Sequence, residues 1–225
     1  SPQNLTWEKS KTWDIGADLG FFNDKLSVTA DYYVKRTEDI LLSINMAGNG
    51  GLKDSPTMNA GTVENKGFEI SARAYLLRKN DAVVNVFGSM AHNKNIIKKI
   101  SNSLESYNKK VDDEQDNYKP GWGEDLETAK PLVQFKEGQS TTAIYAVRSL
   151  GINPMNGKEL FYDLDGNLAY EWSAANKVVC GDTEPKVSGS FGANADWKGF
   201  NLNVSFLYQL GGQVYHPPLG KRVDE

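Results

Sequence analysis

The sequence predicts an all-β fold of long antiparallel strands, and it favours part of a transmembrane β-barrel. Three observations support this prediction. Apolar and polar residues alternate with a period of two in six segments, as they do in strands with one apolar and one polar face. The runs reach about ten residues or more, against the usual five or six in globular sheets. Short turns join the strands in pairs and long segments separate the pairs, as in outer-membrane barrels.

A soluble β-sandwich also alternates apolar core positions with polar surface positions, so alternation alone leaves that fold open. Six strands are too few to enclose a pore for solutes, because the diameter of a barrel grows with its number of strands. If the fold is a barrel, we therefore expect the chain to form a piece of it.

The first pair of strands is separated by the turn Phe22-Asn23-Asp24-Lys25, which has hairpin chemistry. One apolar set precedes this turn and a second follows it, each broken at every second position by a polar or small residue. The two sets are Trp13, Ile15, Ala17, Leu19 and Phe21, then Leu26, Val28, Ala30, Tyr32 and Val34.

The second pair lies on either side of a polar turn at 78–81, and the third pair on either side of Lys198-Gly199. In the second pair, the strand at 84–90 is less regular than its partner, because Phe87 lies on the polar side. The apolar sets are Phe68, Ile70, Ala72, Ala74 and Leu76; Val84, Val86, Gly88 and Met90; Val187, Gly189, Phe191, Ala193, Ala195 and Trp197; and Phe200, Leu202, Val204, Phe206, Tyr208 and Leu210.

These patterns divide the chain into barrel hairpins and loops. We expect hairpins at 1–36, 65–93 and 186–215, an extracellular loop at 37–64, a long extracellular loop at 94–185, and the start of another loop at 216–225. Asn156-Gly157 and Asp165-Gly166 lie between short apolar runs and predict small hairpins inside the long loop. Phe21, Phe22, Trp197 and Phe200 gather at the short-turn end, as an interfacial girdle or as hairpin packing residues.

Composition excludes several classes of function. The net charge of -4 provides no basic field for nucleic acid. No apolar run approaches the roughly 18 residues of a membrane helix. Cys180 is the single cysteine, and His92 and His216 show no metal-ligand or catalytic spacing. We therefore expect no enzyme, no cofactor and no metal site. The opening residues SPQNLTWEKS are not a signal peptide, so we expect an exported protein to have lost its upstream part.

Two groups of residues are candidates for ligand contacts. Charged residues on the polar side of the strands would line the lumen of a barrel and tune what passes. They are Asp14, Asp18, Asp31, Glu69, Arg73 and Asp196. Aromatic residues of the long loop would stack on sugar rings or meet a partner, with packing inside the loop as the alternative. They are Trp122, Tyr145 and Trp172.

Several stretches of the sequence have a distinctive composition and order. These are NLTWEKS at 4–10, NAGTVENKGFEISARA at 59–74, AHNKNII at 91–97, EGQS at 137–140, LGINPMNGKELFYDLDGN at 150–167 and the segment from 200 to 215. Together they closely resemble SusC-like TonB-dependent transporters. They follow the order found in the family and span nearly the whole chain.

The resemblance implies an outer-membrane importer with an N-terminal plug, a TonB box and a 22-strand barrel, of which this sequence supplies about six strands. It also implies a SusD-like surface lipoprotein as a lid, TonB as the energy source through the absent N-terminal region, outer-membrane lipid around the strands, and oligosaccharides or peptides as substrates. The alternative is a secreted β-sandwich module that binds glycans.

Overall fold

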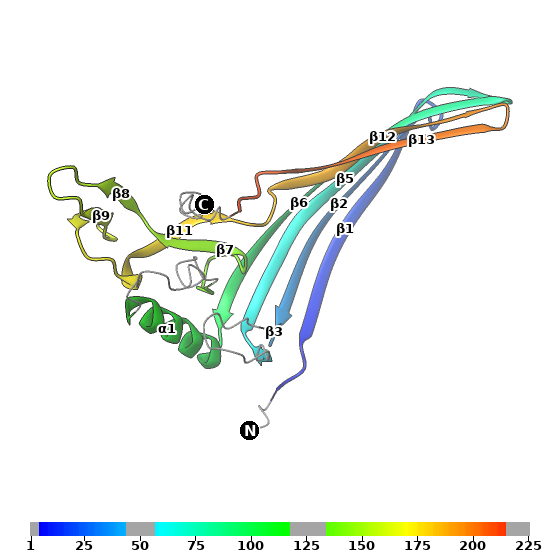
Figure 1. Ribbon diagram of the computed structural model, residues 1–225. Helices are drawn as coiled ribbons and strands as arrows, with labels where there is room; N and C mark the ends of the chain where they lie inside the picture. Colours follow the sequence, from blue (N-terminus) through cyan, green and yellow to red (C-terminus); the bar gives the residue numbers. More distant parts are fainter. Residues whose placement is uncertain (1–4, 44–56, 118–133, 215–225) are drawn as a thin grey trace.

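The computed structural model describes residues 5–43, 57–117 and 134–214. Its largest unit is an antiparallel sheet of six long strands in the order β1-β2-β5-β6-β12-β13 (Figure 1). The strands are β1 (Lys9–Phe21), β2 (Leu26–Glu38), β5 (Gly61–Lys79), β6 (Ala82–Ile100), β12 (Val187–Trp197) and β13 (Phe200–Leu210). The sheet is open in the part of the chain that the structure describes, with β1 and β13 at its edges. The antiparallel all-β prediction is confirmed.

The register keeps the two faces of this sheet chemically distinct. Ile15 lies opposite Tyr32 and Tyr32 opposite Phe68, while Ala193 lies between Val86 and Val204. We call the side that carries these residues the apolar face. The polar face is the other side, where Asp31 lies opposite Glu69. Because side chains alternate along a strand, a slip of one residue would exchange the two faces.

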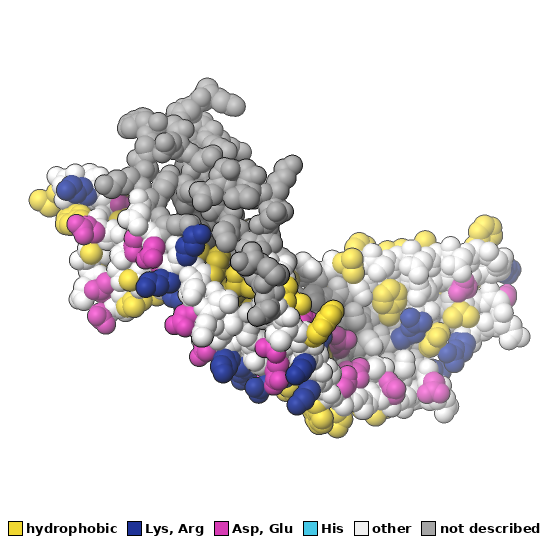
Figure 2. All heavy atoms as spheres, turned by 90° about the horizontal axis from the view of Figure 1, so that it is seen from below, with side chains coloured by type: hydrophobic (Ala, Val, Ile, Leu, Met, Phe, Trp, Pro, Cys, Tyr) yellow, Lys and Arg dark blue, Asp and Glu magenta, His cyan; other side chains and the backbone are white. Residues whose placement is uncertain are grey.

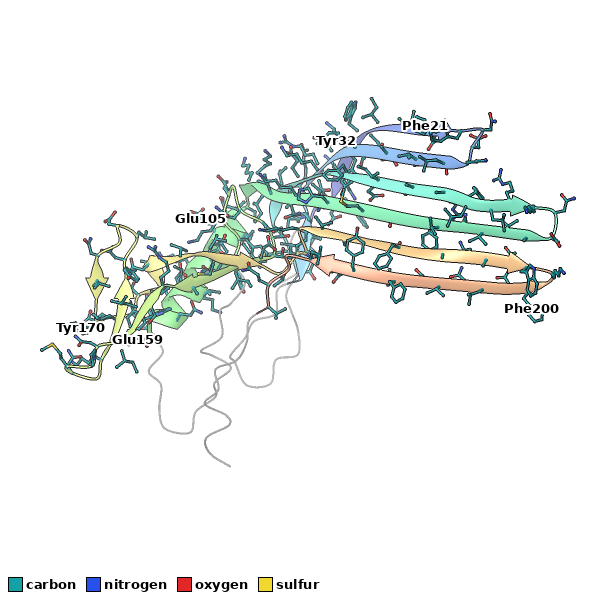
Figure 3. The ribbon with its side chains drawn as sticks, turned by 90° about the horizontal axis from the view of Figure 1, so that it is seen from above. Phe21, Tyr32, Glu105, Glu159, Tyr170 and Phe200 are labelled. Atoms are coloured by element: carbon teal, nitrogen blue, oxygen red, sulfur yellow. The ribbon has the colours of Figure 1, made fainter. Side chains whose placement is uncertain are left out.

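No second layer of the described chain covers the apolar face. Trp13 and Ile15 are each 58% exposed, and Phe191 and Phe206 are 52% and 55% exposed. Figure 3 looks onto this face, where Phe21, Tyr32 and Phe200 are labelled. A β-sandwich would bury these rings between two sheets, so the sandwich alternative is wrong.

The short turns of the three hairpins lie together at one end of the sheet, here called the turn end (Figure 1). Lys198 and Gly199 both have positive φ, 47° and 88°, which is the turn geometry that matches the twist of a two-residue hairpin. Lys198 also donates its backbone N–H to the carbonyl of Asp81 in the neighbouring turn, at 3.0 Å. Trp197 and Phe200 stack here, with ring centroids 6.4 Å apart.

The strands of the second hairpin extend further from the turn end than the sequence predicts. β5 begins at Gly61 and β6 ends at Ile100, whereas the pattern placed this hairpin at 65–93. The alternation reverses from Lys66 toward the start of β5: Lys66 lies on the apolar face, while Val63 is buried on the polar face. Because the sequence pattern predicts a strand from apolar residues that all lie on one face, these reversed positions are not recognised as part of the strand.

A β-bulge changes the end of β5. The ladder passes from Tyr75 directly to Leu77, so Leu77 lies opposite Val84. Leu76, which the sequence pattern assigns to the apolar set of this strand, has no partner in the ladder, because a bulge shifts the alternation by one residue. Arg78 consequently lies opposite Val83 and joins Tyr75 on the polar face.

The end opposite the turns, here called the loop end, holds the packed core. There α1 (Asn102–Asn117) lies beside the strand ends and the short ladder of β3 (Leu41–Ser43) and β4 (Thr57–Asn59) (Figure 1). Ser101 caps α1, since its hydroxyl accepts the N–H of Leu104 at 3.2 Å. The buried core consists of Ala60, Val63, Ile97, Leu104, Tyr107, Val111 and Phe135.

The sequence pattern missed α1, because the apolar stripe of this polar helix is only Leu104, Tyr107 and Val111. None of the helices in the described ranges is long and apolar enough to cross a membrane.

Beyond α1 lie two small sheets. One pairs β7 (Ala143–Val147) with β11 (Lys177–Asp182), and the other contains β8 (Ser149–Ile152), β9 (Glu159–Tyr162) and β10 (Leu168–Ala169). A 3-10 helix, η1 (Ala174–Asn176), precedes β11. Turns with Gly157 and Gly166 at positive φ connect β8 to β9 and β9 to β10, where the sequence predicts small hairpins.

Candidate functional site on the polar face

The register places all six predicted charged residues on the polar face. Figure 2 shows this face, with acidic and basic side chains spread over the sheet. The six residues come from four of the strands and are Asp14 and Asp18 of β1, Asp31 of β2, Glu69 and Arg73 of β5, and Asp196 of β12. Five carboxylates thus share the face with one predicted guanidinium, to which the bulge adds Arg78.

Asp31 and Glu69 form the acidic centre of the face. They lie directly opposite each other and, with Thr29, Ser71 and Ser89, line a hollow of about 220 Å³. Like charges in direct opposition destabilise a sheet unless water or a cation lies between them. A carboxylate pair of this kind is suited to a hydrated surface that attracts cationic groups.

Arg73 and Arg78 form a basic and aromatic cluster nearer the turn end. The guanidinium of Arg78 lies over the ring of Tyr75, with 3.9 Å between its carbon and the ring centroid. The guanidinium of Arg73 lies 5.9 Å from the ring centroid of Phe87. The irregular Phe87 of the sequence pattern therefore has a partner on the polar face. This cluster offers cationic and aromatic contacts to an anionic or planar group.

An amide ladder crosses three strands beside these charges. Asn194 donates from its side-chain amide to the Oδ1 of Asn85 at 3.1 Å, and Asn203 donates to Asn194 at 2.6 Å. The hydroxyls of Ser89 and Ser190 are hydrogen-bonded at 2.9 Å. Sequence reasoning selected charged residues and missed this ladder, although the same period-two pattern places its members on the polar face.

A second polar network lies toward the loop end. The hydroxyl of Tyr33 crosses Gly67 to donate to the Oδ1 of Asn93 at 2.9 Å. Asn93 in turn donates to Asn65 and to Glu184, each at 3.0 Å. The network ties β2, β5 and β6 to the segment before β12, so the loops are fixed to the sheet by polar contacts that sequence spacing does not reveal.

The three predicted aromatic loop residues have different positions. Trp122 lies outside the described residues. Tyr145 of β7 is 2% exposed, with the ammonium of Lys136 5.1 Å from its ring centroid, so it packs inside the loop region and offers no ring face to a ligand. Trp172, 38% exposed, keeps an accessible ring. Tyr145 therefore fits the alternative given for these aromatic residues, which was packing inside the loop.

A buried ion pair holds α1 against β11. The Nζ of Lys177 lies 2.6 Å from the Oδ1 of Asp112 and donates to the Oε1 of Gln115 at 2.7 Å. Burial lowers the pKa of Lys177, and the carboxylate of Asp112 opposes that shift. Asp116 also accepts the backbone N–H of Ala174 at 2.7 Å. The acidic side chains of α1 therefore fix η1 and β11 beside the loop end of the sheet.

The polar face carries charged, amide and hydroxyl side chains along the length of the strands. Across the described ranges, no group of three or more His, Cys, Asp or Glu side chains is placed to hold a metal ion. The charged residues are spread along the strands and do not converge on one point.

Residues 1–222 match the family described as TonB dependent receptor-like, beta-barrel. The chain belongs to this family. The open six-stranded sheet is thus a segment of a β-barrel wall, as the sequence predicts, and its two free edges are those that further barrel strands would extend.

Curated relatives agree with this assignment. The chain is 28% identical over 218 residues to TonB-dependent receptor P3 of Formosa agariphila, covering 94% of this chain and 21% of that protein. It is 25% identical over 226 residues to TonB-dependent receptor SusC of Bacteroides thetaiotaomicron, covering 99% of this chain and 21% of that protein. The chain therefore spans about a fifth of the length of these relatives.

A solved structure shares the fold. The RagAB peptide transporter superposes with a TM-score of 0.62 at 25% sequence identity, covering 92% of this chain and 22% of the matched chain. The same importer in an open-open state gives a TM-score of 0.61. The chain thus resembles SusC-like and RagA-like receptors along nearly its whole length, loops included.

Proposed function

We propose that this chain forms part of the wall and of the extracellular loops of an active outer-membrane importer of oligosaccharides or peptides. The observation that carries the proposal is the uncovered apolar face on six long antiparallel strands of a TonB-dependent receptor barrel. Exposed aromatic and aliphatic side chains are costly in water and stable against acyl chains, whereas the backbone of each strand is satisfied by its neighbours.

In this arrangement the polar face lines the lumen, and Asp14, Asp18, Asp31, Glu69, Arg73 and Asp196 are among the residues past which a substrate moves. The amide ladder of Asn85, Asn194 and Asn203 adds donors and acceptors without net charge. Such a mixed surface suits polar substrates such as glycans and peptides, and the relative RagAB is itself named a peptide transporter.

The loop end faces the cell exterior in this proposal, and the turn end faces the periplasm. A SusD-like lipoprotein would close the loop end, where the sheet of β8, β9 and β10 projects away from the barrel wall (Figure 1). Trp172 follows β10 in the chain and is a candidate contact with this lid. TonB would act on the part of the protein outside this chain. The proposed function includes no nucleic-acid partner and no enzymatic activity.

Uptake by the native organism tests the proposal. Deletion of the gene should abolish import of a labelled oligosaccharide or peptide, and loss of TonB should have the same effect, because a gated barrel cannot transport against a gradient by diffusion. Membrane fractionation should place the protein in the outer membrane. A protein found in the soluble secreted fraction would contradict the proposal.

A second arm tests the polar face. Asp31→Asn with Glu69→Gln should slow uptake of lysine-rich peptides severalfold relative to that of neutral substrates, because the acidic centre would no longer attract cations. The matched control is Asp24→Asn with Asp81→Asn, which removes two carboxylates from the turns. Equal effects of the two variants would show that the acidic centre does not line the transport path.

A further inference from the structure

The apolar face changes character toward the loop end. Beyond the rung that contains Ile15, Tyr32 and Phe68, the same face carries several cations. Four of them, Lys11, Arg36, Lys66 and Lys94, are here called the basic strip, and Lys9 lies beyond them, opposite Glu38. The register relates the members of the strip: Lys11 lies opposite Arg36 on β1 and β2, and Lys66 lies opposite Lys94 on β5 and β6. Val34 and Lys66 are themselves partners, so the strip directly continues the apolar rows.

Arg36 is the paired member of the strip, and Lys11, Lys66 and Lys94 form no ion pair within the described ranges. Lys66 and Lys94 face each other across the strands, and neither forms an ion pair with any residue in the described ranges. Like charges directly opposite are unfavourable in a sheet. Two acids share this part of the face: Glu38 lies 3.7 Å from Arg36 of the strip itself, and Glu64, opposite Arg36, lies 3.3 Å from Lys98. The strip thus has a surplus of positive charge.

The distance of the strip from the turn end matches the thickness of the apolar layer of a membrane. On β1 the apolar residues run from Phe21 to Trp13, eight steps that span roughly 27 Å along the strand. With a strand tilt of about 40°, this is roughly 20 Å along the membrane normal, close to the apolar band of about 25 Å in outer-membrane barrels. Trp13 and Tyr32 form an edge-to-face pair at this boundary, with centroids 6.3 Å apart.

We propose that the basic strip binds the phosphate groups of an anionic membrane lipid whose acyl chains lie on the apolar face. The strip adjoins the acyl-chain region, carries unpaired ammonium groups and lies at headgroup height, and phosphate is the lipid group that such cations recognise. The lipid phosphate relieves the repulsion between Lys66 and Lys94. The turn end differs, since there the face ends in the aromatic residues Phe21, Trp197 and Phe200.

This inference rests on the membrane placement in the proposed function and not on transport. The two are separable, because outer-membrane fractionation and uptake test the function, whereas lipid binding to the purified protein tests the strip.

The experiment uses the full-length detergent-purified protein and native mass spectrometry. The probe is lipid A, which carries two phosphates, and the reference probe is its dephosphorylated form. Lys66→Gln with Lys94→Gln removes the two unpaired cations that face each other, and Lys25→Gln with Lys79→Gln removes two exposed lysines at the turn end as the matched control. We expect about 25-fold weaker lipid A binding in the first variant, from about fivefold per lysine, and little change in the control.

A stability measurement distinguishes a variant that has lost the lipid site from one that binds less lipid only because it folds poorly. Without lipid, Lys66→Gln with Lys94→Gln should unfold at the same or a higher temperature than the unmodified protein, and the stabilisation by lipid A should shrink. Three results would overturn the proposal: equal loss in the control variant, equal binding of the dephosphorylated lipid, or displacement of lipid A by millimolar inorganic phosphate. Unchanged lipid binding with loss of a co-purifying lipoprotein would assign the strip to a protein partner instead.

Discussion

At the scale of single residues, the turn between β9 and β10 depends on one carboxylate. Asp163 accepts the backbone N–H of Asn167 at 2.7 Å and its side-chain amide at 3.0 Å. These hydrogen bonds lower the pKa of Asp163, the side-chain bond most. A depressed carboxyl pKa stabilises the folded turn at and above the ordinary aspartate pKa of 3.8, and the contribution is lost as pH falls through the folded value.

We therefore predict that this turn loosens in acid. Hydrogen exchange of residues 163–169, corrected for intrinsic rates, should show falling protection as the pH drops below the ordinary aspartate range. Asp163→Asn should show weaker protection with little dependence on pH, because no carboxylate remains to titrate. A wild-type turn whose protection stays constant down to pH 2 would contradict this assignment.

Lys177 is the residue on which the placement of α1 depends. Removal of one partner from a buried ion pair leaves a charge without its counterion, at a cost of about 3–5 kcal/mol in closed sites. Asp112 is a third exposed, so water screens its charge and the cost is lower.

For Lys177→Met we predict a loss of about 1–2 kcal/mol in the local stability of α1, and so amide exchange about tenfold faster in 102–117. Lys109→Met, on the exposed side of the same helix, is the matched control and should leave exchange unchanged. If both variants exchange alike, the pair with Asp112 does not hold the helix.

At the scale of elements, close strand packing depends on glycine. A Cβ at Gly67 would lie 2.1 Å from the carbonyl oxygen of His92 and 2.8 Å from the hydroxyl of Tyr33. Backbone is the nearer obstacle and cannot move freely. At Gly88, on the adjacent strand, the nearest atom to such a Cβ is 3.9 Å away, which is ordinary contact.

Gly67→Ala should therefore destabilise the barrel by about 1–3 kcal/mol and break the bond from Tyr33 to Asn93, because overpacking forces the backbone to shift. Gly88→Ala should be nearly neutral. The temperature at which the folded barrel unfolds in detergent, read from its altered gel mobility, checks both. Equal shifts would indicate that the polar network does not need close approach at Gly67.

At the scale of the whole molecule, the proposed function puts the two faces in contact with different solvents. Val204 and Ser205 are neighbours on β13, yet Val204 lies opposite Ala193 on the apolar face and Ser205 lies opposite Gly192 on the polar face. A charge toward acyl chains at mid-bilayer costs about 2–4 kcal/mol, whereas a charge toward a water-filled lumen costs little.

Val204→Arg should therefore reduce the yield of folded protein in the outer membrane severalfold, and Ser205→Arg should assemble near the wild-type level. Heat-modifiable mobility of outer-membrane fractions measures both variants. Similar yields of folded protein for the two variants would mean that the apolar face does not contact lipid.

Alternation in the sequence determined the six strands, their pairing through short turns and the residues of each face, because a period of two follows from strand geometry alone. The structure decided what depends on contacts between distant segments: the reversal at Val63 and Lys66, the bulge beside Leu77, and helix α1, whose three apolar residues are buried only when β5 and β6 lie beside them. Tyr145 of β7 is also buried among segments distant in the sequence, since β7 contacts β11 and η1. The burial of a loop residue depends on the distant segments that contact it, and the local sequence pattern contains no information about those contacts.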